Sequence, residues 1–190
     1  GCPSCSHIHG RCMDAVYPFL HMADKTGDEK YVEGAKLVMT WAENNVSQEN
    51  GAWTVIKNPK SWKGITIFGA IALAEALHYH GHVLDEETRK AWTVRLEKAG
   101  QYIYDTFTID FTNINYPGTA VYGLNLIGGV VNRDDFKVKS KKLASEVKAY
   151  FTENESLLFG ECKKSSSKLS EKGLHGVDLG YNVEETLNSL

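Results

Sequence analysis

The sequence is poor in the features that mark several protein classes. It has four prolines and four cysteines in 190 residues, so it is neither a fibrous or linker chain nor a disulfide scaffold. Gly69 and Glu75 interrupt the longest apolar run, around residues 65–77, and no segment reaches the roughly 20 apolar residues of a membrane span. Positive charge is not in excess. A net charge of −3 argues against nucleic acid as a partner, because nucleic-acid binding usually needs a basic face.

What is present is ordinary globular composition, with 42% hydrophobic and 24% charged residues. A chain of this length can bury one core but is short for two. We therefore expect a single domain over residues 1–190.

A degenerate repeat organises the chain. In each copy an apolar-periodic helix leads to a glycine, then to an acidic or polar turn, then to an aromatic residue of a second helix. The glycines are Gly27, Gly81 and Gly128, each followed within a few residues by an aspartate. Glycine commonly ends a helix, and an acidic residue commonly begins the next one. The repeat predicts three helical hairpins.

The apolar spacing gives the helix bounds. It predicts helices over residues 11–26, 29–46, 64–80, 85–106, 116–128, 133–151 and from about 182 to the end. Residues 53–56 are the best candidate for a strand and fall in a connection. The expected fold class is all-α.

Turns within the hairpins are short, whereas the links between hairpins, residues 1–10, 47–63, 107–115 and 152–181, are long. Stacked antiparallel hairpins place all long links at one end, so we expect the functional site there. A fourth hairpin begins at Tyr181 and stops at Leu190. We interpret it as the start of a further repeat in a longer toroid; the alternative is a short helix that caps an open stack.

The turn Thr26-Gly27-Asp28-Glu29-Lys30-Tyr31, between helices of this length, resembles that of the α/α-toroid carbohydrate-active enzymes. These are the six-hairpin glycosidases and the toroid polysaccharide lyases. The resemblance implies an incomplete α/α toroid, a carbohydrate substrate and no required cofactor. A secreted or periplasmic location is the expectation that goes with it.

The N-terminal segment has the residue types of a metal site. Cys2, Cys5, His7 and Cys12 are candidate zinc ligands, since zinc takes four Cys or His ligands and Cys-x2-Cys supplies two of them. His9 or the distant Cys162 are alternative partners. A disulfide, buried thiols or a flexible terminus explain the same residues without a metal. Some toroid glycosidases carry a cysteine-rich zinc site, so the resemblance to this group supports the metal interpretation.

Two polar clusters are candidates for catalysis. The first is Asn115 with Tyr116, where Asn115 is either a helix N-cap or a donor at the site. The second runs from residue 173 to 185 and contains His175, Asp178, Tyr181 and Glu184, all capable of acid–base work or hydrogen bonding.

Substrate contacts are expected from the other links. Trp53 and Trp62 have faces on which sugar rings stack, and Lys63 can meet a carboxylate or a hydroxyl; packing of the link is the alternative role. Arg11 and His9 are expected to join them from the first link. His78, His80 and His82 are interpreted as a solvated helix end, since steps of two do not share a helical face.

We interpret the protein as a glycoside hydrolase, with Asp178 and Glu184 as the two carboxylates that such chemistry requires. The alternative is a polysaccharide lyase that cleaves a uronate polymer by β-elimination with Asn115, His175 and Tyr181. A non-catalytic helical-repeat binding module is a third possibility.

Overall fold

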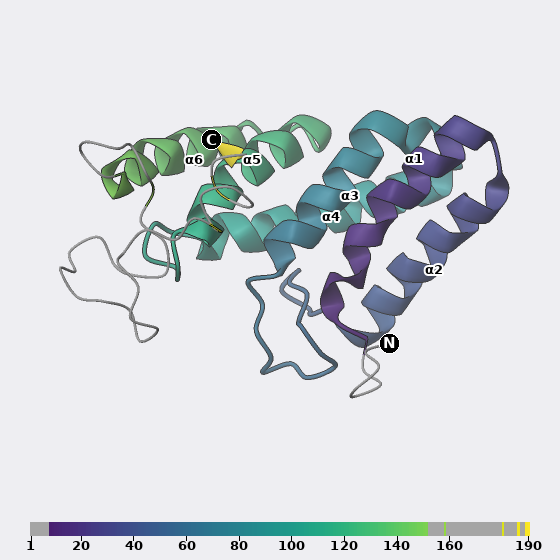
Figure 1. Cartoon of the computed structure of the whole chain (residues 1–190), viewed down its shortest axis with the longest axis horizontal. Helices are drawn as coiled ribbons and strands as arrows, with labels where there is room; N and C mark the ends of the chain where they lie inside the picture. Colours follow the sequence, from purple (N-terminus) through teal and green to yellow (C-terminus); the bar gives the residue numbers. More distant parts are fainter. Residues whose placement is uncertain (1–7, 152–157, 159–179, 181–185, 187–188) are drawn as a thin grey trace.

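Three helical hairpins stand side by side in the computed structural model of the chain (Figure 1). It describes residues 8–151 together with 158, 180, 186, 189 and 190. The elements, in chain order, are η1 (Gly10–Ala15), α1 (Val16–Thr26), α2 (Glu29–Asn45), α3 (Thr66–His80), η2 (Gly81–Val83), α4 (Glu86–Thr106), α5 (Asn115–Val130), α6 (Asp134–Val147) and η3 (Lys148–Tyr150).

The expected all-α class and the six helices predicted over residues 11–151 are confirmed. Two of these helices are partly 3-10 in character: the first over Gly10–Ala15 and the last over Lys148–Tyr150. Within the described residues, the segment 53–56 forms no strand and contributes only an isolated bridge between Ser47 and Trp53. Of the helix predicted from residue 182, only residues 186, 189 and 190 are among the described residues, so this prediction is not tested.

The first hairpin turn follows the sequence expectation closely. Gly27 adopts a left-handed conformation with φ of 68° and closes α1 through its N–H to the Ala23 carbonyl. Asp28 then caps α2 by accepting a hydrogen bond from the N–H of Lys30. Glycine reaches positive φ at no steric cost, and a side-chain oxygen satisfies an unpaired helix N–H.

The second turn uses the expected Gly81 and Asp85, whereas the third turn does not use the expected Gly128. Gly81 keeps a right-handed φ of −61° and begins η2, while Asp85 caps α4 by accepting from the N–H of Thr88. In the third turn the left-handed residue is Asn132, with φ of 59°, and Gly128 lies inside α5. Asparagine tolerates this conformation better than most residues, so glycine is not required there.

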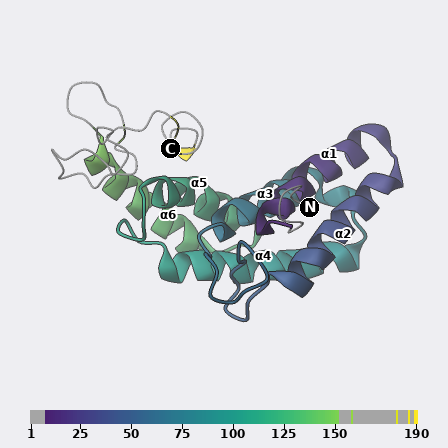
Figure 2. The same cartoon turned by 60° about the horizontal axis from the view of Figure 1, so that its bottom comes forward.

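The hairpins form two layers. α1, α3 and α5 pack against one another with α3 in the middle, and each pairs with the following outer helix, α2, α4 or α6 (Figures 1 and 2). The close approach of α5 to α3 needs a glycine, because a Cβ on Gly123 would lie 2.5 Å from Cδ1 of Ile67. The two long links that the structure describes in full, residues 47–63 and 107–115, lie at the end where α3 and α5 begin (Figure 1).

The central position of α3 explains its sequence. Most of its residues are buried, as expected for a helix covered on nearly all sides. Phe68, Ile71 and Glu75 are half-buried, and Tyr79 is exposed. These positions are three or four residues apart, so they share one face of the helix. We call this face of α3, with the adjoining half-buried residues of α1 and α5, the inner face.

Candidate functional site

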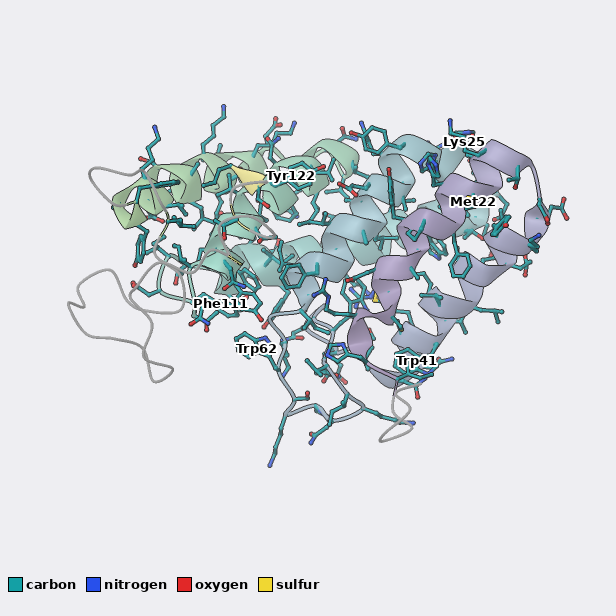
Figure 3. All side chains as sticks on the ribbon, viewed as in Figure 1. Met22, Lys25, Trp41, Trp62, Phe111 and Tyr122 are labelled. Carbon is teal, nitrogen blue, oxygen red and sulfur yellow. The ribbon has the colours of Figure 1, made fainter. Side chains whose placement is uncertain are left out.

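An aromatic platform lies at the link end of the inner face. It consists of Trp62, Phe68, Phe111 and Tyr116. The indole N–H of Trp62 donates to the Tyr116 hydroxyl at 3.0 Å, and the Trp62 ring stacks on Phe111 with centroids 5.6 Å apart. Phe68 extends the platform, with its ring 5.9 Å from that of Tyr116. Trp62 and Phe111 are seen together below α3 and α5 in Figure 3.

The platform offers an accessible ring to a ligand. The Trp62 side of the platform is open to solvent, since Trp62 is 43% exposed. A large exposed aromatic that is fixed by a hydrogen bond and by stacking is unusual on a surface, where such side chains are normally buried. The arrangement can receive the apolar face of a sugar ring.

Arg11 adds a positive charge beside the platform. Its guanidinium carbon lies 4.4 Å from the centre of the Phe68 ring, and its Nε donates to Asp14 Oδ2 at 2.8 Å. Burial raises the pKa of Asp14, and the nearby Arg11 charge opposes that rise. The Arg11 side chain is 46% exposed, so its remaining N–H groups can reach an anionic ligand.

The structure therefore brings together three of the predicted substrate-binding residues: Arg11 of η1, Trp62 of the link 47–63 and Tyr116 of the first turn of α5. His9 lies beside them, where its Nδ1 accepts the backbone N–H of Arg11 and caps η1. Their role in binding substrate stays a prediction. Phe68 and Phe111 complete the platform and were not among the predicted residues.

Asn115 does not occupy the cap position, and its role as a donor at the site stays a prediction. It is the first residue of α5 and 3% exposed, and Ile114 is the N-cap, without a side-chain hydrogen bond. The interpretation of Asn115 as the cap is wrong. The buried amide lies one residue before Tyr116 at the start of α5.

Trp53 requires a correction. It is 1% exposed, with its indole N–H bound to Glu43 Oε1 at 2.9 Å and the Arg95 guanidinium 3.8 Å from its ring centre. A ring covered in this way cannot stack on a sugar, so Trp53 packs the link against α2 and α4. The Lys63 ammonium group donates to the Pro59 carbonyl within its own loop, and its contact with substrate stays a prediction.

The remaining predicted residues cannot be placed. His175, Asp178, Tyr181 and Glu184, and the candidate metal ligands Cys2, Cys5 and His7, lie outside the described residues. Cys12 is a half-buried free thiol in η1. Burial and the nearby Asp14 carboxylate raise its pKa to about 11, which keeps the thiol protonated at neutral pH in this state.

The sequence predicted a solvated cluster of histidines at the end of α3. This is wrong for His80, which is buried. His80 is 7% exposed; its Nδ1 is 3.1 Å from Asp24 Oδ2 and its Nε2 is 3.3 Å from His21 Nδ1. His82 binds the other Asp24 oxygen at 2.8 Å. This polar cluster joins α1 to α3 at the opposite end from the platform.

Comparisons with known proteins agree with this architecture. The family model described as "Ulvan lyase N-terminal domain" matches residues 1–190. A protein of Formosa agariphila named "Broad-specificity ulvan lyase" is 79% identical over 189 residues. The match covers 100% of this chain and 30% of that relative, so the chain spans less than a third of the relative's length.

Two solved structures share the fold at low sequence identity. A sugar epimerase from a ruminal bacterium superposes with a TM-score of 0.63 at 15% identity, covering 90% of this chain and 46% of that one. A family 88 glycosyl hydrolase from Bacteroides vulgatus has a TM-score of 0.63 at 16% identity, with 87% and 56% covered. They confirm the predicted α/α-toroid fold and carry no evidence on the reaction.

Among the described residues, no helix has the length and apolarity that crossing a membrane requires. The helical-hairpin architecture, the match along all 190 residues and the close relative agree with one another. The chain belongs to the ulvan lyase N-terminal domain family.

Proposed function

We propose that the complete protein is a polysaccharide lyase acting on ulvan, and that this chain forms one wall of its substrate cleft. The observation that carries the proposal is the exposed Trp62, fixed against Tyr116 and Phe111 with Arg11 beside them. An aromatic ring with an adjacent cation matches a sugar unit that carries an anionic group. The 79% identical relative, named an ulvan lyase, supports the substrate.

β-Elimination on a uronate unit makes specific demands on such a site. A base removes the proton next to the carboxylate, the glycosidic oxygen leaves, and a double bond forms within the sugar ring. Negative charge grows on the carboxylate as the proton departs, so a fixed positive charge there lowers the barrier. Arg11 is suited to this task because its guanidinium group stays charged and presents several N–H donors.

The aromatic platform positions the sugar unit. The Tyr116 hydroxyl accepts from Trp62, which leaves its own O–H free to donate to a ligand. Asn115 directly precedes Tyr116 as the first residue of α5. For the acid–base steps we retain His175 and Tyr181 as the candidates from the sequence.

The named function of the relative favours the lyase over the hydrolase that the sequence first suggested. Asp178 and Glu184 are therefore no longer our preferred catalytic pair.

The test is the product of the complete protein on ulvan. A lyase generates new reducing ends together with an unsaturated sugar that absorbs ultraviolet light, in equal amounts. Reducing ends without the absorbance would establish hydrolysis and overturn the proposal. Binding without either signal would establish a non-catalytic module.

A further inference from the structure

A second polar cluster lies further along the inner face. The Tyr122 hydroxyl donates to Glu75 Oε1 at 2.9 Å, which joins α5 to α3. Tyr79 follows Glu75 by one turn on α3, and the rings of Tyr17 and Tyr79 both lie against His80, with centroids 5.5 and 6.4 Å from its ring. We call these four residues, Tyr17, Glu75, Tyr79 and Tyr122, the tyrosine–glutamate cluster. It draws on all three inner helices.

The cluster continues the surface of the aromatic platform. Glu75 follows Phe68 by seven residues on α3, which places it on the same face and about 10 Å further along the axis. Tyr122 follows Tyr116 on α5 in the same direction. A polymer lying along the inner face can therefore contact the platform with one sugar unit and the cluster with another.

The groups of the cluster suit hydroxyl-bearing ligands. Burial, and then the bond to Glu75, raise the pKa of Tyr122 to about 12, so its hydroxyl stays protonated and is not a base. Among the described residues no donor binds Glu75 Oε2, which leaves it able to accept from a ligand hydroxyl. Tyr79 is 54% exposed and presents an aromatic face.

Charge distinguishes the two parts of the inner face. Arg11 places a positive charge beside the platform, whereas Glu75 places a negative charge in the cluster. A carboxylate disfavours an anionic sugar nearby and favours one that donates hydroxyl hydrogens. The two parts are therefore complementary to different units of one chain.

We propose that the tyrosine–glutamate cluster is a second sugar subsite, which takes an uncharged, hydroxyl-rich unit of the polymer whose anionic unit lies against Arg11. This inference rests on the proposed function, since it assumes a polysaccharide substrate. The alternative is a purely structural role, in which the Tyr122–Glu75 hydrogen bond only holds α5 to α3.

The experiment compares variants of the complete protein on ulvan oligosaccharides of two lengths. We expect Glu75→Gln and Tyr79→Ala to lower kcat/KM on the long substrate on the order of tenfold, as for the loss of a hydrogen bond to a charged group. The loss on the shortest cleaved substrate should be smaller, because that substrate does not reach the cluster. Glu97→Gln is the matched control, since Glu97 binds Arg133 on the outer layer.

Three outcomes would overturn the subsite. These are equal losses on both lengths, a lowered Tm with unchanged kcat/KM, or a loss for Glu97→Gln as large as for Glu75→Gln. Turnover by the wild type distinguishes failure of the subsite proposal from failure of the proposed function. If the wild type leaves ulvan intact, the lyase proposal fails, and calorimetric binding of the same two oligosaccharides to wild type and Glu75→Gln decides the subsite.

Discussion

Trp62 and Tyr116 are 54 residues apart in the sequence, yet the indole N–H of one donates to the hydroxyl of the other at 3.0 Å. Trp62 belongs to the link 47–63, and Tyr116 lies in the first turn of α5, directly after the link 107–115. Their bond shows that the link end of the fold is a joint surface rather than a set of separate loops. The predictions that follow test what this surface and its supports do.

Truncating the exposed ring of the platform should weaken substrate binding. We expect Trp62→Ala in the complete protein to raise KM for ulvan on the order of tenfold, which corresponds to about 1.4 kcal/mol of lost contact. Initial rates over a range of ulvan concentrations give the value. Leu37→Ala removes another exposed apolar side chain, 70% exposed on α2, and should leave KM unchanged. An unchanged KM for Trp62→Ala would exclude the platform from the binding site.

Removing the positive charge should change the response to salt. Arg11→Gln is expected to raise KM and to make it less dependent on ionic strength, because screening then has one fewer attraction to weaken. The measurement is KM at several salt concentrations. Lys30→Gln, which removes a cation paired with Asp28 at the opposite turn, should keep the wild-type slope. Parallel slopes for wild type and Arg11→Gln would contradict the role of Arg11.

The glycine before Arg11 should be sensitive to any side chain. A Cβ at Gly10 would lie 2.1 Å from the Thr54 carbonyl oxygen, and the Gly10 N–H binds the Val55 carbonyl at 2.7 Å. We expect Gly10→Ala to cost about 1–3 kcal/mol of unfolding free energy, as overpacking does. Denaturant unfolding provides the measurement. Gly129→Ala, where a Cβ meets nothing within 4 Å, is the control.

Stability should fall in acid partly through Asp85. Hydrogen bonds from Thr88, and then Lys36, lower its pKa from 3.8 to about 2. A depressed pKa contributes stability above pH 3.8 that is lost as the pH falls toward 2. The Tm difference between wild type and Asp85→Asn should therefore be largest above pH 4 (roughly the unfolded pKa of Asp) and vanish near pH 2 (about the folded value). A difference that is constant with pH would contradict this assignment.

The metal interpretation of the N-terminal cysteines stays a proposal. If Cys2, Cys5, His7 and Cys12 bind zinc, elemental analysis of the complete protein should give about one zinc per chain, as for a single four-ligand site. Cys12→Ser should lower this content. An oxidised Cys2–Cys5 bridge, or thiols that react freely without loss of metal, would contradict it.

The helices could be predicted from the sequence because each carries its own local evidence. The apolar period, Gly27 after α1 and Asp28 before α2 act within a few residues of one another, so no distant contact is needed to read them. The turn at Asn132 was missed because asparagine supplies a left-handed residue where glycine was expected. The error concerns only which residue makes the turn.

The site was less predictable because contacts with residues far away in the sequence decide which of its side chains are buried and which are exposed. Trp53 and Trp62 occur in the same link, and nothing local indicates that Arg95 and Glu43 cover only the first. His80 is buried by residues of α1 more than 50 positions away. Phe111 had a usable signal, as an aromatic residue four positions before Asn115 in a long link.

The link that carries Trp62 is held by its own backbone. Val55 donates to the Trp62 carbonyl at 3.1 Å and accepts from Gly10, while Trp53 binds Thr66 at the start of α3. A ring presented in this way is already ordered before a ligand arrives. Little conformational entropy is then lost from the protein on binding, so more of the contact energy appears as affinity. Preorganisation of the surface that presents Trp62 thus follows from hydrogen bonds made within the protein.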